Sequence, residues 1–411
     1  MKAGWKVKKL GCLCEIELGK TPSRANKAFW DEKCETSNVW LSIADLLNGE
    51  GNFVTDSKEY LSDKGAAVSK IVRKGTLLVS FKLTLGRLAF AGRDLFTNEA
   101  IAALNLFKEQ VLSKEYLFYF LHHFDWDKAC EGDVKLKGKT LNKAKLKEMD
   151  VHFPTLSEQQ HIVGILDKAF EGIATAKAKA EKNLQNARAL FEGHLQSVFT
   201  KRGNGWVEKQ LGDKNLLEIV DGDRGANYPK TTDFYDEGHC LFLNTKNVRP
   251  NGFDFESTMF ITADKDSKLR KGKLKRDDVV MTTRGTIGNI GHFSKDVPFD
   301  NIRINSGMLI FRPNKLSLLP SFLFEILRSE IVKEQIRNQT TGAAQPQLPI
   351  KTLVNFKIPV PQKLEEQHSI VNELRAFEPE TQRLESIYQQ KLAKLEELKK
   401  SLLHQAFTGQ L

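Results

Sequence analysis

Gly4-Trp5-x-x-Lys8-x-Leu10-Gly11 opens the chain, and the same pattern returns 201 residues later as Gly205-Trp206-x-x-Lys209-x-Leu211-Gly212. Near the other end of each copy, Gln160-His161 and Ala169-Phe170 return as Gln367-His368 and Ala376-Phe377, at an offset of 207. The segments between these anchors have diverged heavily. A repeated frame around two dissimilar segments predicts one architecture that presents two different surfaces. An enzyme with a single active site has no obvious need for that arrangement.

Length and charge predict two cores and an acidic partner. The 411 residues exceed one ordinary domain. The formal net charge of +10 and an isoelectric point of about 9.1 favour a polyanion such as nucleic acid, although many basic proteins bind nothing acidic. No apolar run approaches the ~20 residues of a membrane span, and no apolar signal core follows the basic N-terminus. We therefore expect a cytoplasmic protein with no membrane partner.

The cysteines favour neither a disulfide framework nor a metal site. They are an odd number of scattered thiols: Cys12, Cys14, Cys34, Cys130 and Cys240. A zinc site on Cys12-x-Cys14 would need partners at ligand spacing, and neither Cys34 nor a nearby histidine supplies them. We expect reduced thiols and no bound metal.

Each copy begins with a mixed segment and ends with a long helical one. In the mixed segments, glycine-bearing turns separate short β-like runs such as 76–81 and 278–282, and apolar helical stretches such as 116–121 and 322–327 are interspersed. The pattern predicts an α+β fold with mixed α/β globular domains over 1–153 and 203–358. The helical regions are predicted over 154–202 and 359–411.

The first long helix is predicted to begin after Pro154, which closes a strand. Ser157-Glu158-Gln159-Gln160 has the form of a capping box, with a hydroxyl at the cap and glutamine three residues on. Small and apolar residues then recur at alternating steps of four and three, the heptad spacing of a coiled coil: Ile162, Leu166, Ala169, Ile173, Ala176, Ala180, Leu184 and Ala187.

The second long helix follows Pro359-Val360-Pro361 and lacks a hydroxyl cap, because Leu364 stands at the place matching Ser157. Pro379 predicts a kink or a restart within it. Each helix of about 40 residues would be roughly 60 Å long, so neither can bury its apolar seam on a small domain. We therefore expect the helices to pair antiparallel as a coiled coil in a pseudo-twofold dumbbell, with a globular domain at either end. The alternative is that each helix packs against a partner protein.

This layout resembles the specificity subunit of type I restriction–modification systems, over the whole chain. The resemblance is carried by Pro154-x-x-Ser157-Glu158-Gln159-Gln160-His161-Ile162-Val163, by the matching segment 359–371, and by the terminal segment 405–411. It implies two target-recognition domains, each reading one half of a split double-stranded DNA sequence. It also implies that modification subunits, two in number, bind along the helices and carry S-adenosylmethionine and the methyltransferase chemistry. The presence of restriction subunits stays open.

The sequence lacks motifs of catalysis, which agrees with a subunit that has no cofactor and no catalytic role. There is no Gly-x-x-x-x-Gly-Lys-Ser/Thr loop and no Asn/Asp-Pro-Pro-Tyr/Phe string. Asp31-Glu32-Lys33 and Asp266-Ser267-Lys268 match fragments of a nuclease site but are better explained as surface charge. Two rival functions remain: a DNA-processing enzyme with an unrecognised site, and a coiled-coil architectural protein that binds all DNA sequences alike.

Three loops of the second domain combine hydrogen-bonding side chains with cations, and we expect them to contact bases or phosphates rather than to be ordinary solvated turns. They span 221–230, 244–247 and 340–348; the second aligns with the more apolar 42–45 of the first copy. Glutamines of the third can pair with adenine edges. The candidate contacts are Arg224, Asn227, Tyr228, Lys230, Asn244, Lys246, Gln345 and Gln347.

A glycine-rich segment, 284–291, invites comparison with a phosphate loop. Its spacing differs from that of dinucleotide-binding loops, and Thr84-Leu85-Gly86 matches Thr286-Ile287-Gly288 at an offset of 202. A glycine turn shared by the two sheets explains both segments. Arg284 and Arg87, which flank these turns, are further candidate DNA contacts.

The first domain has lysines where the second has the glutamine loop. Lys135–Leu141 is the counterpart of that loop, because Leu141 and Leu348 are related by the offset of 207. Lys137 and Lys139 are therefore candidate phosphate contacts that carry little base information. His161 and His368 recur at the helix starts, where we expect structural or interface groups rather than acids or bases.

Overall fold

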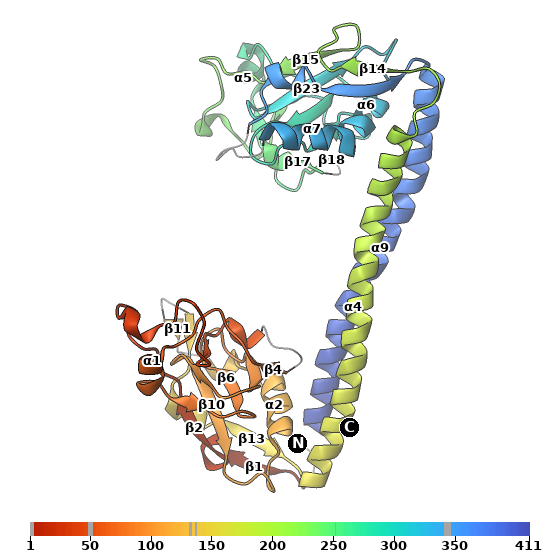
Figure 1. The fold of residues 1–411 in the computed structure, drawn as a ribbon. Helices are drawn as coiled ribbons and strands as arrows, with labels where there is room; N and C mark the ends of the chain where they lie inside the picture. Colours follow the sequence, from red (N-terminus) through yellow and green to blue (C-terminus); the bar gives the residue numbers. More distant parts are fainter. Residues whose placement is uncertain (1–3, 48–51, 131–133, 136–137, 251, 341–346) are drawn as a thin grey trace. The chain divides into compact units, whose positions relative to one another are not determined.

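The computed structural model describes the chain except residues 1–3, 48–51, 131–133, 136–137, 251 and 341–346 (Figure 1). It forms two compact units. Unit 1 consists of Met1–Ala180 and Gln390–Leu411, and unit 2 of Glu181–Gln389. Two 45-residue helices, α4 (Leu156–Thr200) and α9 (Leu364–Thr408), each contribute one part to each unit. Each unit therefore contains one mixed domain and a segment of both long helices.

In unit 1, the two ends of the mixed domain are joined by an antiparallel pair of strands, β1 (Lys6–Lys9) and β13 (Asp150–Phe153). The central sheet has the order β2 (Cys14–Leu18), β10 (Ile101–Leu106), β6 (Leu77–Ser80), β8 (Leu88–Ala91) and β4 (Phe53–Val54). The domain also contains two small three-stranded sheets. The first has the order β3 (Trp40–Leu41), β9 (Leu95–Thr97) and β5 (Ile71–Val72). The second has the order β11 (Val134–Lys135), β12 (Gly138–Thr140) and β7 (Lys82–Leu83). The helices are α1 (Asp63–Ala67), α2 (Lys114–His123) and α3 (Lys143–Lys147).

Unit 2 repeats this plan. Strands β14 (Trp206–Gln210) and β24 (Lys357–Pro361) join the ends of its domain. The main sheet has the order β15 (Leu217–Asp221), β23 (Met308–Pro313), β20 (Val279–Thr282) and β21 (Ile290–His292). Smaller sheets are formed by β19 (Phe260–Ile261), β16 (Cys240–Leu243) and β22 (Ile302–Ile304), and by β17 (Val248–Arg249) with β18 (Gly252–Phe253). Its helices are α5 (Ala263–Lys268), α6 (Pro320–Leu327), α7 (Glu330–Thr340) and α8 (Ile350–Leu353).

The core of each domain extends onto the long helices. In unit 1, every residue of Tyr116–Leu121 on α2 is buried, and Ile162 and Leu166 of α4 belong to the same cluster. Leu403 and Ala406 of α9 complete it. In unit 2 the corresponding cluster joins Phe322 of α6 to residues of both long helices: Leu195, Phe199, Ile370, Val371 and Leu374. Burial of apolar surface therefore fixes each helix segment to its own domain.

The long helices pair antiparallel within each unit (Figure 1). In unit 1, Lys177 Nζ lies 2.7 Å from Glu396 Oε1. In unit 2, Arg188 Nε lies 3.2 Å from Glu385 Oε2. Along the pair, the residue numbers of the α9 partners fall as the residue numbers on α4 rise, as antiparallel helices require. Along α4 the predicted seam is buried at Ile173, Ala180 and Ala187. The predicted fold of two mixed domains joined by paired antiparallel helices is confirmed, and the helices do pack on each other rather than only on partner proteins.

The cap predicted for α4 was wrong. The helix begins at Leu156, and the hydroxyl of Thr155, not that of Ser157, accepts a 3.4 Å hydrogen bond from the N–H of Glu158. The strand before it ends at Phe153, so Pro154 and Thr155 form the whole connection. In the second copy α9 continues through Pro379, which excludes the predicted restart.

Buried glutamines fasten the start of each long helix to its domain. Gln159 Oε1 accepts from the N–H of Ser113 (2.9 Å), and its Nε2 donates to the carbonyls of Val111 (2.9 Å) and Pro154 (3.0 Å). Gln367 repeats all three bonds, from Leu319 N–H (2.9 Å) and to the carbonyls of Ser317 (3.0 Å) and Pro361 (2.9 Å). We refer to these residues as the helix-start glutamines.

This equivalence corrects the register of the repeat at the helix starts. Gln159 and Gln367 are 208 residues apart, whereas the match of Gln160-His161 with Gln367-His368 implies 207. Gln160 is exposed, and Ile162 and Leu166 are buried like Ile370 and Leu374, also at 208. His161 and His368 are both exposed and are not equivalent positions.

Candidate nucleic-acid interface

Both domains contain the predicted glycine turn. In the β6–β8 connection, Gly86 has φ +71 and its N–H donates to the carbonyl of Ser80 at 2.9 Å. In the β20–β21 connection, Gly288 has φ +87 and donates to Thr282 at 2.9 Å. Because glycine adopts positive φ without steric cost, a turn requirement explains both glycines. The interpretation as a shared turn is confirmed.

A second shared turn lies beside the first, and sequence reasoning missed it. We call Asn98–Ala100 and Asn305–Gly307 the central turns. Each asparagine Oδ1 accepts from the N–H two residues on, at 3.1 Å in unit 1 and 2.9 Å in unit 2. The carbonyls of Ala100 and Gly307 accept from the N–H of Phe81 (3.1 Å) and Thr283 (2.8 Å). An asparagine repeated at an offset of 207 is the sequence signal that could have revealed them.

A glycine packs against each central turn and starts a surface loop. A Cβ on Gly19 would lie 2.2 Å from the carbonyl oxygen of Asn98, and a Cβ on Gly222 would lie 2.3 Å from that of Asn305. Neither backbone position tolerates a side chain. The segment 20–27 of the first domain is therefore the counterpart of the predicted loop 221–230, a relation that the diverged sequences conceal.

In unit 2, three of the predicted loops meet at the central turn. Arg224 Nη2 contacts the carbonyl of Ser306 at 3.4 Å. A Cβ built on Gly307 would lie 3.2 Å from Thr245 Cγ2 and 3.7 Å from Arg284 Cβ. Arg284 also forms an antiparallel bridge with Gln347. The structure thus brings together exposed side chains from separate parts of the chain, which we call the central-turn surface: Arg224, Lys246, Arg284 and Gln347.

A buried carboxylate organises the first of these loops. Asp223 accepts from the N–H groups of Gly225 (2.6 Å), Arg270 (2.7 Å) and Lys271 (3.3 Å). Burial raises the pKa of Asp223, but the hydrogen bonds from these N–H groups lower it by a larger amount. The pKa of Asp223 therefore lies below its ordinary value. The anionic carboxylate therefore holds the loop that presents Arg224.

The other predicted residues of unit 2 mainly support this surface. Tyr228 is half-buried against Phe242, with ring centres 5.8 Å apart. Asn244 accepts from the N–H of Lys246 at 2.8 Å and so shapes its own turn. Asn227 and Lys230 are exposed, and Asn227 donates to a carbonyl at 3.4 Å.

In unit 1, Arg87 is turned inward. It is half-buried, and its Nη1 donates to the carbonyl of Ile43 at 3.1 Å. Asn289, its counterpart at an offset of 202, likewise donates to the carbonyl of Val248 at 2.8 Å. Arg87 ties the glycine turn to the neighbouring 42–45 turn, and Asn289 ties it to Val248, directly after the 244–247 turn. The structure therefore gives Arg87 a supporting contact.

The lysine segment of unit 1 is described only in part. Lys139 lies in β12, paired with Leu83 of β7, and the adjacent pairing of Thr140 with Lys82 corresponds to the bridge between Arg284 and Gln347. Lys137 and Gln345 lie outside the described residues.

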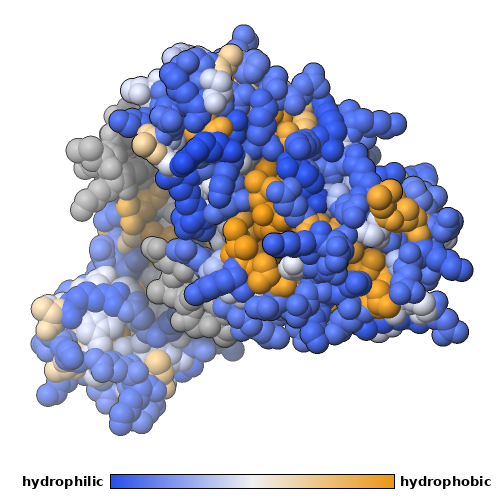
Figure 2. Space-filling view, turned by 90° about the horizontal axis from the view of Figure 1, so that it is seen from above, coloured by the Kyte–Doolittle hydropathy of each residue, from blue (hydrophilic) through white to orange (hydrophobic). Residues whose placement is uncertain are grey.

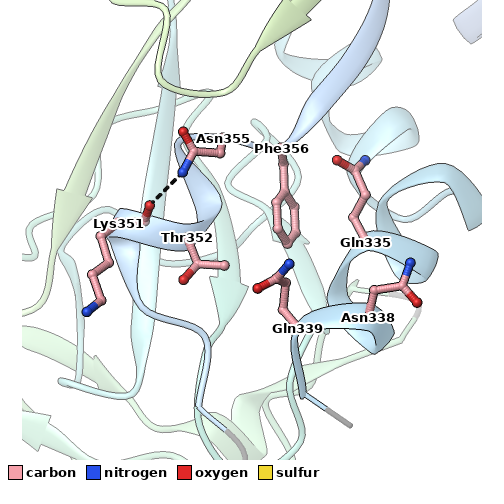
Figure 3. A pocket seen from close by; sticks show the side chains of 7 residues that line it. All are labelled: Gln335, Asn338, Gln339, Lys351, Thr352, Asn355 and Phe356. Carbon is pink, nitrogen blue, oxygen red and sulfur yellow. Dashed lines mark hydrogen bonds between the residues drawn. The ribbon is translucent and has the colours of Figure 1, made fainter.

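A pocket of about 380 Å³ beside the glutamine loop adds carboxamides that sequence reasoning missed (Figure 3). Gln335 and Asn355 are engaged locally: Gln335 exchanges two 2.9 Å bonds with the backbone of Lys357, and Asn355 donates to Lys351. Asn338 and Gln339, at the end of α7, are exposed. These two side chains belong to the helix before the predicted loop 340–348, and nothing in the sequence marks them as part of the same surface.

Neither a metal cluster nor a membrane span is found in the described part of the chain. No group of three or more His, Cys, Asp or Glu residues there could hold a metal ion. None of its helices is long and apolar enough to cross a bilayer. The face in Figure 2 is mostly hydrophilic, with separate hydrophobic patches among polar side chains.

Comparisons with known proteins place the chain in one family. The model of the type I restriction modification DNA specificity domain matches twice, over residues 2–185 and 203–397. The MjaIX specificity subunit of Methanocaldococcus jannaschii is 25% identical over 405 residues, covering 90% of this chain and 86% of that protein. The MjaVIII specificity subunit of the same organism is 26% identical, covering 99% and 93%.

Solved structures share the fold. One, from work described as the structural basis of complex assembly and conformational transition of the type I R-M system, has a TM-score of 0.77 at 19% identity and covers 100% of this chain and 99% of its own. The HsdS subunit of Thermoanaerobacter tengcongensis has a TM-score of 0.55 at 18% identity, covering 100% and 98%. With two family-model matches spanning both copies of the repeat, the chain belongs to the specificity subunits of type I restriction–modification systems, with two target-recognition domains.

Proposed function

We propose that each domain reads one half of a bipartite double-stranded DNA sequence and that this chain has no catalytic role. Two modification subunits, which bind S-adenosylmethionine, would methylate the DNA, and restriction subunits, where present, would cleave it. The observation that carries the proposal is the pair of central turns, because the same backbone frame holds different side chains in the two domains.

Equivalent positions around the central turns differ in chemistry. Arg284 corresponds to Lys82, Gln347 to Thr140 and Ser306 to Glu99, at offsets of 202, 207 and 207. Each base pair presents its own pattern of donors and acceptors in the major groove. Surfaces with different donors and acceptors on one frame therefore suit two different half-sites. A non-specific architectural protein would not require this difference.

The long helices supply a surface for protein partners. Large apolar side chains on them stay exposed although the seam is filled: Leu190, Leu384, Ile387 and Leu398 are between 36% and 49% exposed. Apolar side chains left in water on paired helices favour further helix or domain packing. We propose that the modification subunits bind this surface. We also propose that the length of the paired helices sets the spacing between the two half-sites.

The test is methyl transfer with and without partners. The purified chain with S-adenosylmethionine and duplex DNA should transfer no methyl groups. The same chain assembled with its modification subunits should methylate adenine at a split sequence. Methyl transfer by the chain alone would contradict the non-catalytic assignment, and binding of every duplex with equal affinity by the assembled complex would contradict sequence reading.

A further inference from the structure

The loop 20–27 of unit 1 is positioned like the loop 221–230 of unit 2. It starts at Gly19, which packs on the central turn as Gly222 does. Arg24 follows Gly19 by five residues, as Asn227 follows Gly222. Resting on the proposed function of the first domain, we propose that Arg24 reads a guanine in the half-site of that domain.

Hydrogen bonds within the first domain hold the loop in place. The N–H of Lys20 donates to the carbonyl of Thr97 at 2.8 Å. The indole N–H of Trp40 donates to the carbonyl of Lys20 at 3.3 Å, and that of Trp30 donates to the carbonyl of Ser23 at 3.2 Å. The indoles of the two tryptophans therefore fix the backbone at Lys20 and at Ser23, and Arg24 directly follows the second of these positions.

The guanidinium of Arg24 is also fixed. Its Cζ lies 4.1 Å from the ring centre of Trp30 and 4.8 Å from that of Trp40. Both terminal nitrogens donate to the carboxylate of Glu59, with Nη2 3.1 Å from Oε2. Stacking and a bidentate ion pair together restrict a side chain that otherwise loses much rotamer freedom on binding. A preorganised arginine loses less entropy when it contacts a base.

Enough of the side chain remains accessible for a second contact. It is 55% exposed despite the ion pair. Because Glu59 is engaged by the two terminal nitrogens, the other edge of the guanidinium, formed by Nε and Nη2, can still donate two parallel hydrogen bonds. That geometry fits O6 and N7 of guanine in the major groove. Arg24 also lines a pocket of about 370 Å³ at the surface of this unit.

The surrounding charges favour a base edge over a phosphate at Arg24. The pocket is lined by three carboxylates, those of Asp31, Glu32 and Glu59, which repel a phosphate anion close to the guanidinium. Lys27 and Lys58 on the same pocket are exposed and can contact the DNA backbone beside the base. In this arrangement Arg24 would contact the edge of a base, and the two lysines beside it would contact phosphates.

The experiment maps the recognised sequence with the chain assembled with its modification subunits, using a duplex library randomised over both half-sites. Arg24→Ala and Arg24→Lys are compared with Arg73→Ala. Arg73 is the matched control because it makes an exposed 2.7 Å ion pair with Asp94 in the same domain, at the far end of β9 from the central turn.

Arg24→Ala should reduce the preference for guanine at one position of one half-site by about 5- to 150-fold and leave the other half-site unchanged. Arg24→Lys keeps the charge but loses the fork, so it should lose most of the same preference. Arg73→Ala should match the wild type. An unchanged half-site in both Arg24 variants, or equally weakened binding to all sequences, would overturn the assignment. Failure of the wild-type complex to select any split sequence would instead overturn the proposed function.

Discussion

Replacing Gln159 by leucine should loosen the start of α4 from the first domain. The carboxamide is fully buried and makes three hydrogen bonds, at 2.9, 2.9 and 3.0 Å, to the backbone of Ser113, Val111 and Pro154. Each such bond contributes about 0.5–1.5 kcal/mol net, and leucine would leave three backbone groups buried without partners. The free energy of unfolding of the first domain should therefore fall by about 3 kcal/mol.

The neighbouring glutamine provides the control. Gln160 is exposed, so Gln160→Leu should change the free energy of unfolding by less than about 0.5 kcal/mol. Urea unfolding measures the global effect, and hydrogen exchange of the Ser113 amide measures the local one. Equal destabilisation by the two variants, or a larger effect at Gln160, would refute the 208-residue register and the role of the helix-start glutamines.

Three further predictions concern pH, base preference and spacing. Burial lowers the pKa of His292 below its ordinary 6.5, so a proton binds the unfolded chain more readily than the folded one. The second domain should therefore lose stability as the pH falls below 6.5, and His292→Gln should flatten that dependence in urea unfolding. Arg284→Ala should relax base preference in one half-site, whereas Lys139→Ala should weaken binding to all sequences and reduce the slope of log affinity against log salt by about one. Matched seven-residue insertions at opposite points of the two long helices add about 10 Å of helix and should lengthen the preferred spacer by no more than about three base pairs. An insertion in α4 alone should lower the melting temperature. An unchanged spacer in site selection would show that the partners set the distance between the half-sites.

The features predictable from sequence are those in which the backbone itself restricts the residue. Gly86 and Gly288 are visible because positive φ favours glycine in both copies. The heptad seam of α4 is visible because helical periodicity places Ile173, Ala180 and Ala187 on one buried face. These constraints act between residues that are close in the chain, so they can be recognised from a single sequence.

The features that sequence reasoning missed depend on contacts between distant segments. The need for glycine at position 19 arises from the carbonyl of Asn98, which is far away in the chain. The helix-start register was misassigned because the identical pair Gln-His outweighed the burial pattern of Ile162 and Leu166. Arg87 stays a candidate DNA contact because its charge is visible in the sequence, but its bond to the carbonyl of Ile43 could not be predicted from the sequence.

The most direct test of the central claim is an exchange of one domain. Residues 213–350 would be replaced by the equivalent segment of a relative, and the methylated sequences of the complex with modification subunits would be mapped before and after. If each domain reads its own half-site, one half of the recognised sequence changes and the other half and the spacer remain. A change in both halves would contradict the division of reading between the two domains.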